Sequence, residues 1–295
     1  MSASTSAERG RDTLATLVAP VLWGTTYLVT TEWLPANVPM TLAMLRALPA
    51  GLLLMAATRS MPSPLWMARS LVLGALNFSL FWSLLFVAAY RLPGGVAATL
   101  GAMQALVVVV MARLILHAPM RPLAIAAAVG GVAGVGLLVL GPRAALDPIG
   151  VAAGLGGALA WGTGTVLSRK WQPPVAALPF TAWQLVAGGL LLLPLAWWLE
   201  PALPRPSLAH LAGYLWLGVF GAAISYWLWF RGIARIGPGA ASMLAMASPL
   251  TAMILGWFWL DQALTLVQGA GAALVLGAIW VGQRAHRTGP SRGRA

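Results

Sequence analysis

The sequence predicts an all-α polytopic membrane protein whose ten transmembrane helices form two inverted five-helix repeats. Three observations predict this fold. The 295 residues are 60% hydrophobic and only 8% charged, with a mean hydropathy of +0.84, a composition that soluble domains do not have. Apolar stretches of about 20 residues, the length that crosses a bilayer, recur along the whole chain. Short motifs of the first half also return in the second half.

The apolar stretches are separated by short connections rich in proline and glycine, so consecutive spans are expected to run antiparallel. The ten predicted spans cover residues 14–33, 38–58, 67–90, 94–115, 122–141, 149–168, 178–199, 208–230, 238–260 and 265–283.

The internal repeat is visible as matched motifs. Trp23-Gly24-Thr25 returns as Trp161-Gly162-Thr163, 138 positions later, and Arg91 matches Arg235 at an offset of 144. Because each repeat has an odd number of spans, the second must enter the membrane from the opposite side, as in many secondary transporters. We expect one five-helix repeat in residues 1–143 and the other in 144–295, which adds a basic cytoplasmic tail.

The basic residues predict the orientation. Of the 18 lysines and arginines, fourteen lie in the two tails and in the loops on the same side, and only three lie in the opposite loops. Such a bias places both termini in the cytoplasm. The net charge of +12 therefore reflects membrane topology, and we expect no nucleic-acid partner.

Several classes of function are disfavoured. The chain has no cysteine, which excludes disulfides and thiolate metal sites. All six carboxylates and all three histidines fall in tails or at span ends, so we expect no enzyme, metal site, cofactor or intramembrane proton relay. A channel is disfavoured because the sequence has neither charged rings nor a repeated carbonyl filter motif.

The repeats resemble a known family. Ten spans in two repeats that each open on Trp-Gly, with Arg46 in the second span and Ser248-Pro249-Leu250 in the ninth, resemble the EamA-type branch of the drug/metabolite transporter superfamily. Within it, the abundant inward aromatics are similar to those of the aromatic amino-acid exporters of bacterial inner membranes. The resemblance implies an inner-membrane exporter with a central cavity lined by spans 1, 3, 4, 6, 8 and 9, spans 5 and 10 being peripheral.

The candidate substrate contacts are polar and aromatic residues that fall within spans. Aromatic faces attract an ammonium group and stack a flat ring, while an unpaired amide is unfavourable in hydrocarbon. The candidates are Trp23, Tyr27, Asn77, Phe78, Phe81, Trp82, Thr99, Met103, Gln104, Trp161, Thr165, Tyr226 and Ser248. Helix packing is the alternative role for the aromatic residues, and a helix-to-helix hydrogen bond is the alternative for the two amides.

Two further residues stand out. Arg46 is the only full charge well inside a span, about 12 Å below the membrane surface. It is either a contact for a substrate carboxylate or a structural charge that ties helix ends together. Pro249 removes a helix hydrogen bond and predicts either a helix break facing the cavity or a simple kink.

These features predict a carrier that works by alternating access on neutral and aromatic amino acids. With no embedded proton relay, uniport or facilitated export is the simplest coupling. The alternative is a multidrug or organic-cation exporter of the same fold, because the same aromatic groups bind organic cations. The expected partners are a small-molecule substrate and the lipid bilayer; the sequence specifies no oligomeric state, and a monomer is compatible with it.

Overall fold

The fold is a bundle of membrane-spanning helices. A computed structural model describes residues 6–92, 94–139, 147–259 and 265–287, and all regular structure in these ranges is helical. Nine helical segments in them are long and apolar enough to cross a membrane, and Pro122–Leu138 is a shorter apolar helix at the position of the fifth predicted span. The predicted all-α polytopic fold is confirmed.

Several predicted spans consist of two helices joined by a turn. The first repeat contains α1 (Ser6–Trp33), α2 (Pro39–Thr58), α3 (Pro64–Gly74), η1 (Ala75–Ser79), α4 (Leu80–Arg91), α5 (Gly94–Ala102), α6 (Gln104–Leu116) and α7 (Pro122–Val139). The second contains α8 (Pro148–Lys170), α9 (Ala177–Leu199), α10 (Leu208–Gly218), η2 (Val219–Ile224), α11 (Ser225–Ile236), α12 (Pro238–Leu244), α13 (Ala247–Trp259) and α14 (Leu266–Arg287).

Some predicted boundaries were wrong. The first helix starts at Ser6 rather than at residue 14, because its polar first turns continue the helix out of the apolar stretch, with Glu8 favourably placed at the N-terminal end. The eighth span continues to Ile236 rather than ending at residue 230. The predicted ends at 141 and 260, and the proposed repeat boundary between 143 and 144, lie outside the described residues.

The two repeats make equivalent contacts. Span 1 packs on span 8 (α1 on α11) as span 6 packs on span 3 (α8 on α4), while α2 packs on α9 and α7 on α14. Each third span of a repeat contains a π-helical turn, η1 and η2, which begin 144 positions apart. A π turn inserts one extra residue and rotates the remainder of the helix by about 100°.

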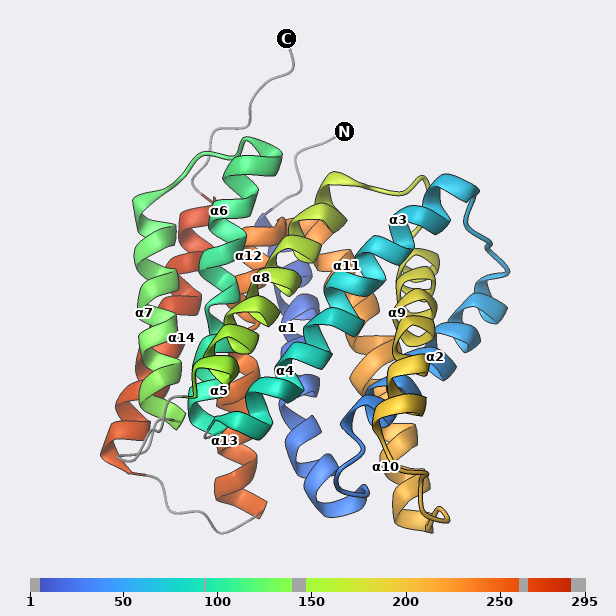
Figure 1. Ribbon diagram of the computed structural model, residues 1–295. Coiled ribbons are helices and arrows are strands. Elements are labelled where there is room, and N and C mark those ends of the chain that lie inside the picture. Colours follow the sequence, from blue (N-terminus) through green and yellow to red (C-terminus); the bar gives the residue numbers. More distant parts are fainter. Residues whose placement is uncertain (1–5, 93, 140–146, 260–264, 288–295) are drawn as a thin grey trace.

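The start of α1 and the end of α14 share one face of the bundle (Figure 1). Arg9 near the start of α1 donates to the carbonyl of His286 near the end of α14, at 2.8 Å. We call this the termini face. The end of α8 also lies there, since Arg169 donates to the carbonyl of Ala234 in α11, while Asp12 at the start of α1 pairs with Arg231 of α11. Helices α1 and α8 therefore run in opposite directions, as inverted repeats require.

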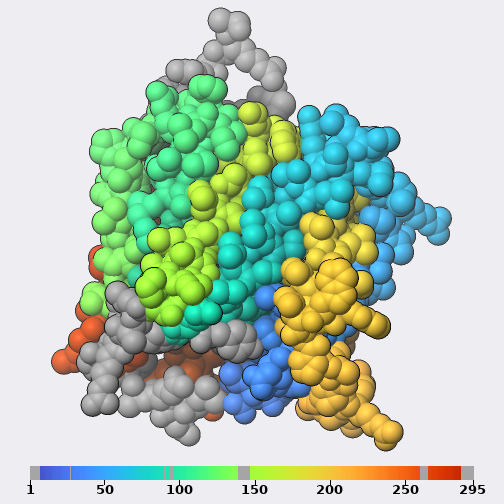
Figure 2. Space-filling model, in the orientation of Figure 1, coloured from blue at the N-terminus to red at the C-terminus, as the bar shows by residue number. Residues whose placement is uncertain are grey.

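The outer surface on one side is formed by diagonal helices. Figure 2 shows α4 and α8 lying side by side across the bundle. Behind them is the largest core cluster, which contains Trp23, Phe78, Trp161, Tyr226 and Trp229. Aromatic packing at the middle of the bundle therefore closes the space between the repeats.

Candidate functional site: a central cavity

The bundle contains a cavity of about 750 Å³. At one end the cavity is lined by Leu34, Asn37 and Pro39, in and beside the connection between α1 and α2 at the face opposite the termini. Its inner end is lined by Trp23 and Tyr226 in the aromatic core. Such a volume suits a small-molecule site.

The cavity wall is built mainly from the spans that the family resemblance implied. Spans 1, 3, 4, 6, 8 and 9 all contribute, and no described residue of α7 or α14 lines the cavity. Span 2 is an addition that was not expected: Leu42, Ala43 and Arg46 of α2 also line the wall. Arg46 is anchored against the π turn η2, where it bonds to the carbonyl of Gly221.

Four aromatic side chains close the inner end of the cavity. Trp161 stacks on Phe81 with ring centroids 5.0 Å apart and meets Trp23 edge-on at 5.6 Å. Trp23 also contacts Tyr226 at 4.9 Å. The indole Nε1 of Trp23 donates to the hydroxyl of Ser225 at 3.0 Å. These contacts bring together Trp23 and Trp161, the matched tryptophans of the two repeats, and form the floor of the cavity, as we call its inner end.

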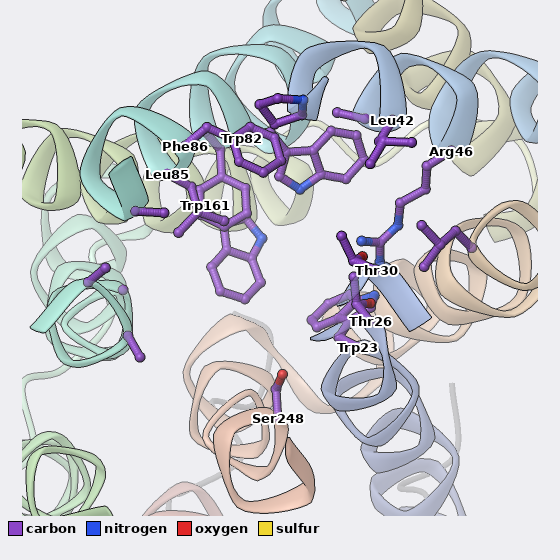
Figure 3. Close-up of a pocket in the computed structure, with 18 of the residues that line it drawn as sticks. Trp23, Thr26, Thr30, Leu42, Arg46, Trp82, Leu85, Phe86, Trp161 and Ser248 are labelled. Atoms are coloured by element: carbon purple, nitrogen blue, oxygen red, sulfur yellow. The ribbon is translucent and has the colours of Figure 1, made fainter. Parts of the chain in front are cut away.

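Arg46 provides the positive charge of the wall. Its Nε and Nη2 atoms donate to the carbonyl of Gly221 at 3.1 and 2.5 Å, and its guanidinium carbon lies 5.3 Å from the centroid of a ring of Trp82. Figure 3 shows Arg46 reaching from α2 toward Thr26 and Thr30 of α1. The charge is thus held in place by backbone and aromatic contacts at the edge of the cavity.

Three polar atoms on three different walls have no hydrogen-bond partner among the described residues. They are the Oγ1 atom of Thr26 on α1, the Oε1 atom of Gln104 on α6 and the Nε1 atom of Trp161 on α8. All three residues line the cavity. An unsatisfied buried polar atom costs about 1–3 kcal/mol. Each of these atoms is itself buried, so a ligand in the cavity reaches it only after the wall rearranges.

The structure brings together most of the predicted substrate contacts. The predicted residues that line the cavity are Trp23, Arg46, Phe81, Trp82, Gln104, Trp161, Tyr226, Ser248 and Pro249. Figure 3 shows Ser248 across the cavity from Trp82.

Other predicted contacts lie elsewhere. Asn77 is buried among helices and donates to Gln184 at 2.9 Å. Phe78 lies behind the wall, packed on Trp82 and Tyr226 with centroids 5.3 and 4.7 Å away. Thr99, Met103 and Thr165 are also outside the lining. Tyr27 belongs to α1, but its side chain lies outside the described part of the chain.

The predicted helix break at Pro249 lies a few residues earlier. The ninth span is interrupted by a turn at Ala245 and Met246, and α13 starts at Ala247. Pro249 therefore occupies the first turn of α13, where its missing N–H leaves no intrahelical bond unmade. A matching interruption at Met103 separates α5 from α6 in the fourth span.

Sequence reasoning missed several lining residues. Thr26 and Thr30 follow Trp23 at positions three and seven along α1, so helical periodicity from Trp23 could have found them. Phe86 lies four residues after Trp82 and lines the same wall. Among the described residues, no group of three or more histidines, cysteines, aspartates or glutamates could hold a metal ion.

Comparison with known proteins identifies the family. The profile of the EamA-like transporter family matches residues 12–140 and again residues 148–281. The chain belongs to the EamA-like transporter family. It is therefore a multi-pass membrane transporter of the drug/metabolite transporter superfamily, and not an enzyme.

Individual relatives agree with this assignment. This EamA-type transporter is 42% identical over 267 residues to protein PecM of Dickeya dadantii (strain 3937), covering 90% of each chain. It is 25% identical to the uncharacterized inner membrane transporter YedA of Escherichia coli (strain K12), over 88% of this chain and 86% of YedA. A solved structure with 23% identity matches with a TM-score of 0.80 over 94% of this chain and 99% of that chain, which shows the shared fold.

Proposed function

We propose that this transporter carries neutral and aromatic amino acids out of the cell by alternating access. The observation that supports the substrate class most strongly is the charge of the cavity. Arg46 is the only side chain that is charged at neutral pH among the described residues that line it. A fixed guanidinium attracts a carboxylate and repels a cation, so the wall favours a substrate with a carboxylate group.

The rest of the wall suits the remainder of an amino acid. The rings of Phe81, Trp82 and Trp161 give the wall an apolar surface against which an apolar or aromatic side chain can pack. The unpartnered oxygen atoms of Thr26 and Gln104 are buried in the wall, and we propose that they turn toward the cavity to accept from an ammonium group when the substrate binds. One molecule that carries a carboxylate, an ammonium and an apolar group would use all three kinds of contact.

The transport cycle we propose is downhill. No aspartate, glutamate or histidine is among the described residues that line the cavity, so the lining offers no side chain that takes up a proton near neutral pH. The substrate gradient alone would then drive the cycle. The direction of net movement follows the concentrations on the two sides, and export corresponds to an amino acid that accumulates inside.

For the orientation, we propose cytoplasmic termini in a bacterial inner membrane, with repeats in residues 1–143 and 144–295. The bias of basic residues toward the side of the tails supports cytoplasmic termini. YedA, named an inner membrane transporter, supports the location. In that orientation the cavity extends to the non-cytoplasmic face.

An organic-cation exporter is the second candidate, because several ring faces line one cavity and aromatic faces bind cations. The charge of Arg46 opposes it. The two candidates differ in their response to one chemical change in the ligand, namely removal of the carboxylate.

The experiment that tests the proposal uses purified protein in liposomes and inhibition of labelled phenylalanine uptake. Unlabelled tryptophan, threonine and methionine should compete. Phenethylamine, which is phenylalanine without its carboxylate, should compete at least about tenfold less well, because a hydrogen bond to a charged group is lost. Failure of phenylalanine to enter, together with saturable accumulation of tetraphenylphosphonium, would replace the proposal with the cation exporter.

A further inference from the structure

The polar wall of the cavity has a counterpart in the second repeat. Thr30 and Arg46 line the cavity, and the residues 138 positions later are Ser168 and Gln184. The same offset relates the two Trp-Gly-Thr motifs. The two repeats therefore place a hydroxyl and a long polar side chain at equivalent positions of α1 and α8, and of α2 and α9.

The contacts of these residues are equivalent as well. Arg46 donates to Gly221 in the π turn η2, and Gln184 accepts from Asn77 in the π turn η1, at 2.9 Å. Asn77 and Gly221 are themselves 144 positions apart, the offset between the two π turns. The same polar link thus occurs once in each repeat, with different chemistry.

The two links lie at matched depths on opposite sides of the membrane. Arg46 is the eighth residue of α2, which starts at the face opposite the termini, and Gln184 is the eighth residue of α9, which starts at the termini face. At 1.5 Å per residue, each lies about 12 Å from the end of its helix. Arg46 borders the cavity, whereas Gln184 is closed off.

The second link is buried but incompletely satisfied. Asn77, Ser168 and Gln184 are exposed by 1%, 4% and 0%. The Nδ2 atom of Asn77 contacts both the Oγ of Ser168 at 3.3 Å and the Oε1 of Gln184. Its Oδ1 atom has no hydrogen-bond partner among the described residues. In a purely structural cross-link, an unpaired buried acceptor such as Asn77 Oδ1 would only destabilise the fold.

Ion pairs join α1 to α11 at the termini face. Asp12 of α1, which is 7% exposed, pairs with Arg231 at 2.7 Å and with Arg235 at 3.8 Å. The related pair on the other face joins Arg91 and Asp147 at 3.6 Å, with both side chains more than a third exposed. The tighter and more buried pair therefore lies on the termini face, opposite the end of the cavity that Leu34 and Asn37 line.

We propose that Asn77, Ser168 and Gln184 form a second substrate contact, used when the carrier is open to the termini face. The inference rests on the proposed carrier function. This contact has amide and hydroxyl donors and one free amide acceptor, but no full charge, so it suits the two ends of a zwitterion. It holds a carboxylate less strongly than Arg46 does on the other face, and the two faces of the carrier differ in affinity.

Transport from each face separately tests the role of Gln184. In vesicles of each orientation, Gln184→Met should raise the KM for phenylalanine entering from the termini face about tenfold. The KM for entry from the opposite face should change less than about twofold. Gln268→Met is the control, since it removes side-chain amide bonds outside the cluster, to the carbonyl of Leu138 and to Thr265. An equal loss of rate in both directions, with neither KM changed, would show a structural cross-link and overturn the inference.

Accessibility gives an independent readout, because the chain has no cysteine of its own. Ser168→Cys should react with an impermeant thiol reagent from the termini face, and phenylalanine should slow the reaction. Adding Asp12→Asn, which weakens the ion pair with Arg231, should speed it about tenfold. Thr30→Cys, its counterpart, should react from the opposite face and more slowly in the Asp12→Asn background.

The two proposals fail in distinguishable ways. If Ser168→Cys stays unreactive in both backgrounds while phenylalanine is still transported, the second contact is wrong and the carrier function stands. If the two cysteines exchange accessibility in the Asp12→Asn background but phenylalanine neither enters nor protects, the proposed substrate is wrong, and the opening of the Asn77 cluster is supported.

Discussion

Arg46 and Trp82 form the point of the cavity wall where charge and aromatic surface meet. The guanidinium carbon lies 5.3 Å from the centroid of a Trp82 ring, and the same group donates to the carbonyl of Gly221. A guanidinium held over an indole and anchored on one side keeps a fixed direction. A substrate carboxylate that enters the cavity therefore meets a positioned charge.

The variant Arg46→Gln introduces glutamine, which is the residue at the equivalent position of the second repeat, Gln184. It should raise the KM for phenylalanine by about 10- to 100-fold, because the charge-assisted hydrogen bond to the carboxylate is lost. Competition by phenethylamine should be nearly unchanged. Arg46→Lys keeps the charge but loses the two-pronged set of donors. Its KM for phenylalanine should lie between those of the parent protein and Arg46→Gln. Equal losses for phenylalanine and phenethylamine would assign Arg46 a structural role only.

Trp161→Ala should weaken phenylalanine binding about tenfold or more. The ring stacks on Phe81 and forms part of the cavity floor, and its loss removes both aromatic contact and enclosure. Trp161→Phe should recover part of the affinity. Trp197→Ala is the control, because Trp197 is 81% exposed on the outside of the bundle. Uptake kinetics of the three variants measure the effect, and an unchanged KM in Trp161→Ala would remove this residue from the site.

Glu200→Gln should destabilise the protein without changing its substrate preference. The Glu200 carboxylate accepts from the backbone N–H groups of Met40 and Thr41, at 2.5 and 2.7 Å, and so caps α2 from the loop after α9. Loss of a charged cap costs about 0.5–2 kcal/mol, which corresponds to a fall in Tm of a few degrees. The Tm is measured by intrinsic tryptophan fluorescence on heating. The exposed Glu32→Gln variant should melt like the parent protein.

Both termini should lie in the cytoplasm. The start of α1 and the end of α14 share one face of the bundle, and most basic residues lie on that side. A fluorescent protein fused to either end should be fluorescent in bacterial cells, and alkaline phosphatase fused to either end should be inactive. Active phosphatase at the C-terminus would show the opposite orientation. The cavity would then extend to the cytoplasmic face.

The spans were predictable from the sequence because apolar length alone marks a helix that crosses a bilayer. The place of Trp23 and Trp161 in the cavity wall agrees with the repeat, since inverted halves bring equivalent positions to the middle; their contact with each other was not predicted. The surroundings of Asn77 did not follow, because hydropathy does not specify which side of a buried helix faces a cavity, and the π turn at Ala75–Ser79 changes the register after it. The position of Thr26, three residues after Trp23, could have been found from helical periodicity, but its unpartnered hydroxyl could not, since a threonine in a helix normally bonds to its own backbone.

Contacts between residues that are distant in the chain could not be predicted from the sequence either. Asp12 was recognised only as a charge at a span end, yet the folded chain buries it against Arg231, 219 positions away. The contact from Arg46 of α2 to Gly221, 175 positions away, is of the same kind. Pairings of this kind are set by how helices pack, and a single sequence does not record them.

The central claim is that the protein is a carrier of amino acids, and counterflow tests it most directly. Liposomes that contain the purified protein are loaded with unlabelled phenylalanine and diluted into a trace of labelled phenylalanine, with equal ion concentrations on both sides. A carrier should accumulate the label above its equilibrium level for a time, because efflux of unlabelled substrate returns the site to the outside. A rise to equilibrium with no such overshoot, or no entry of label at all, would contradict the account.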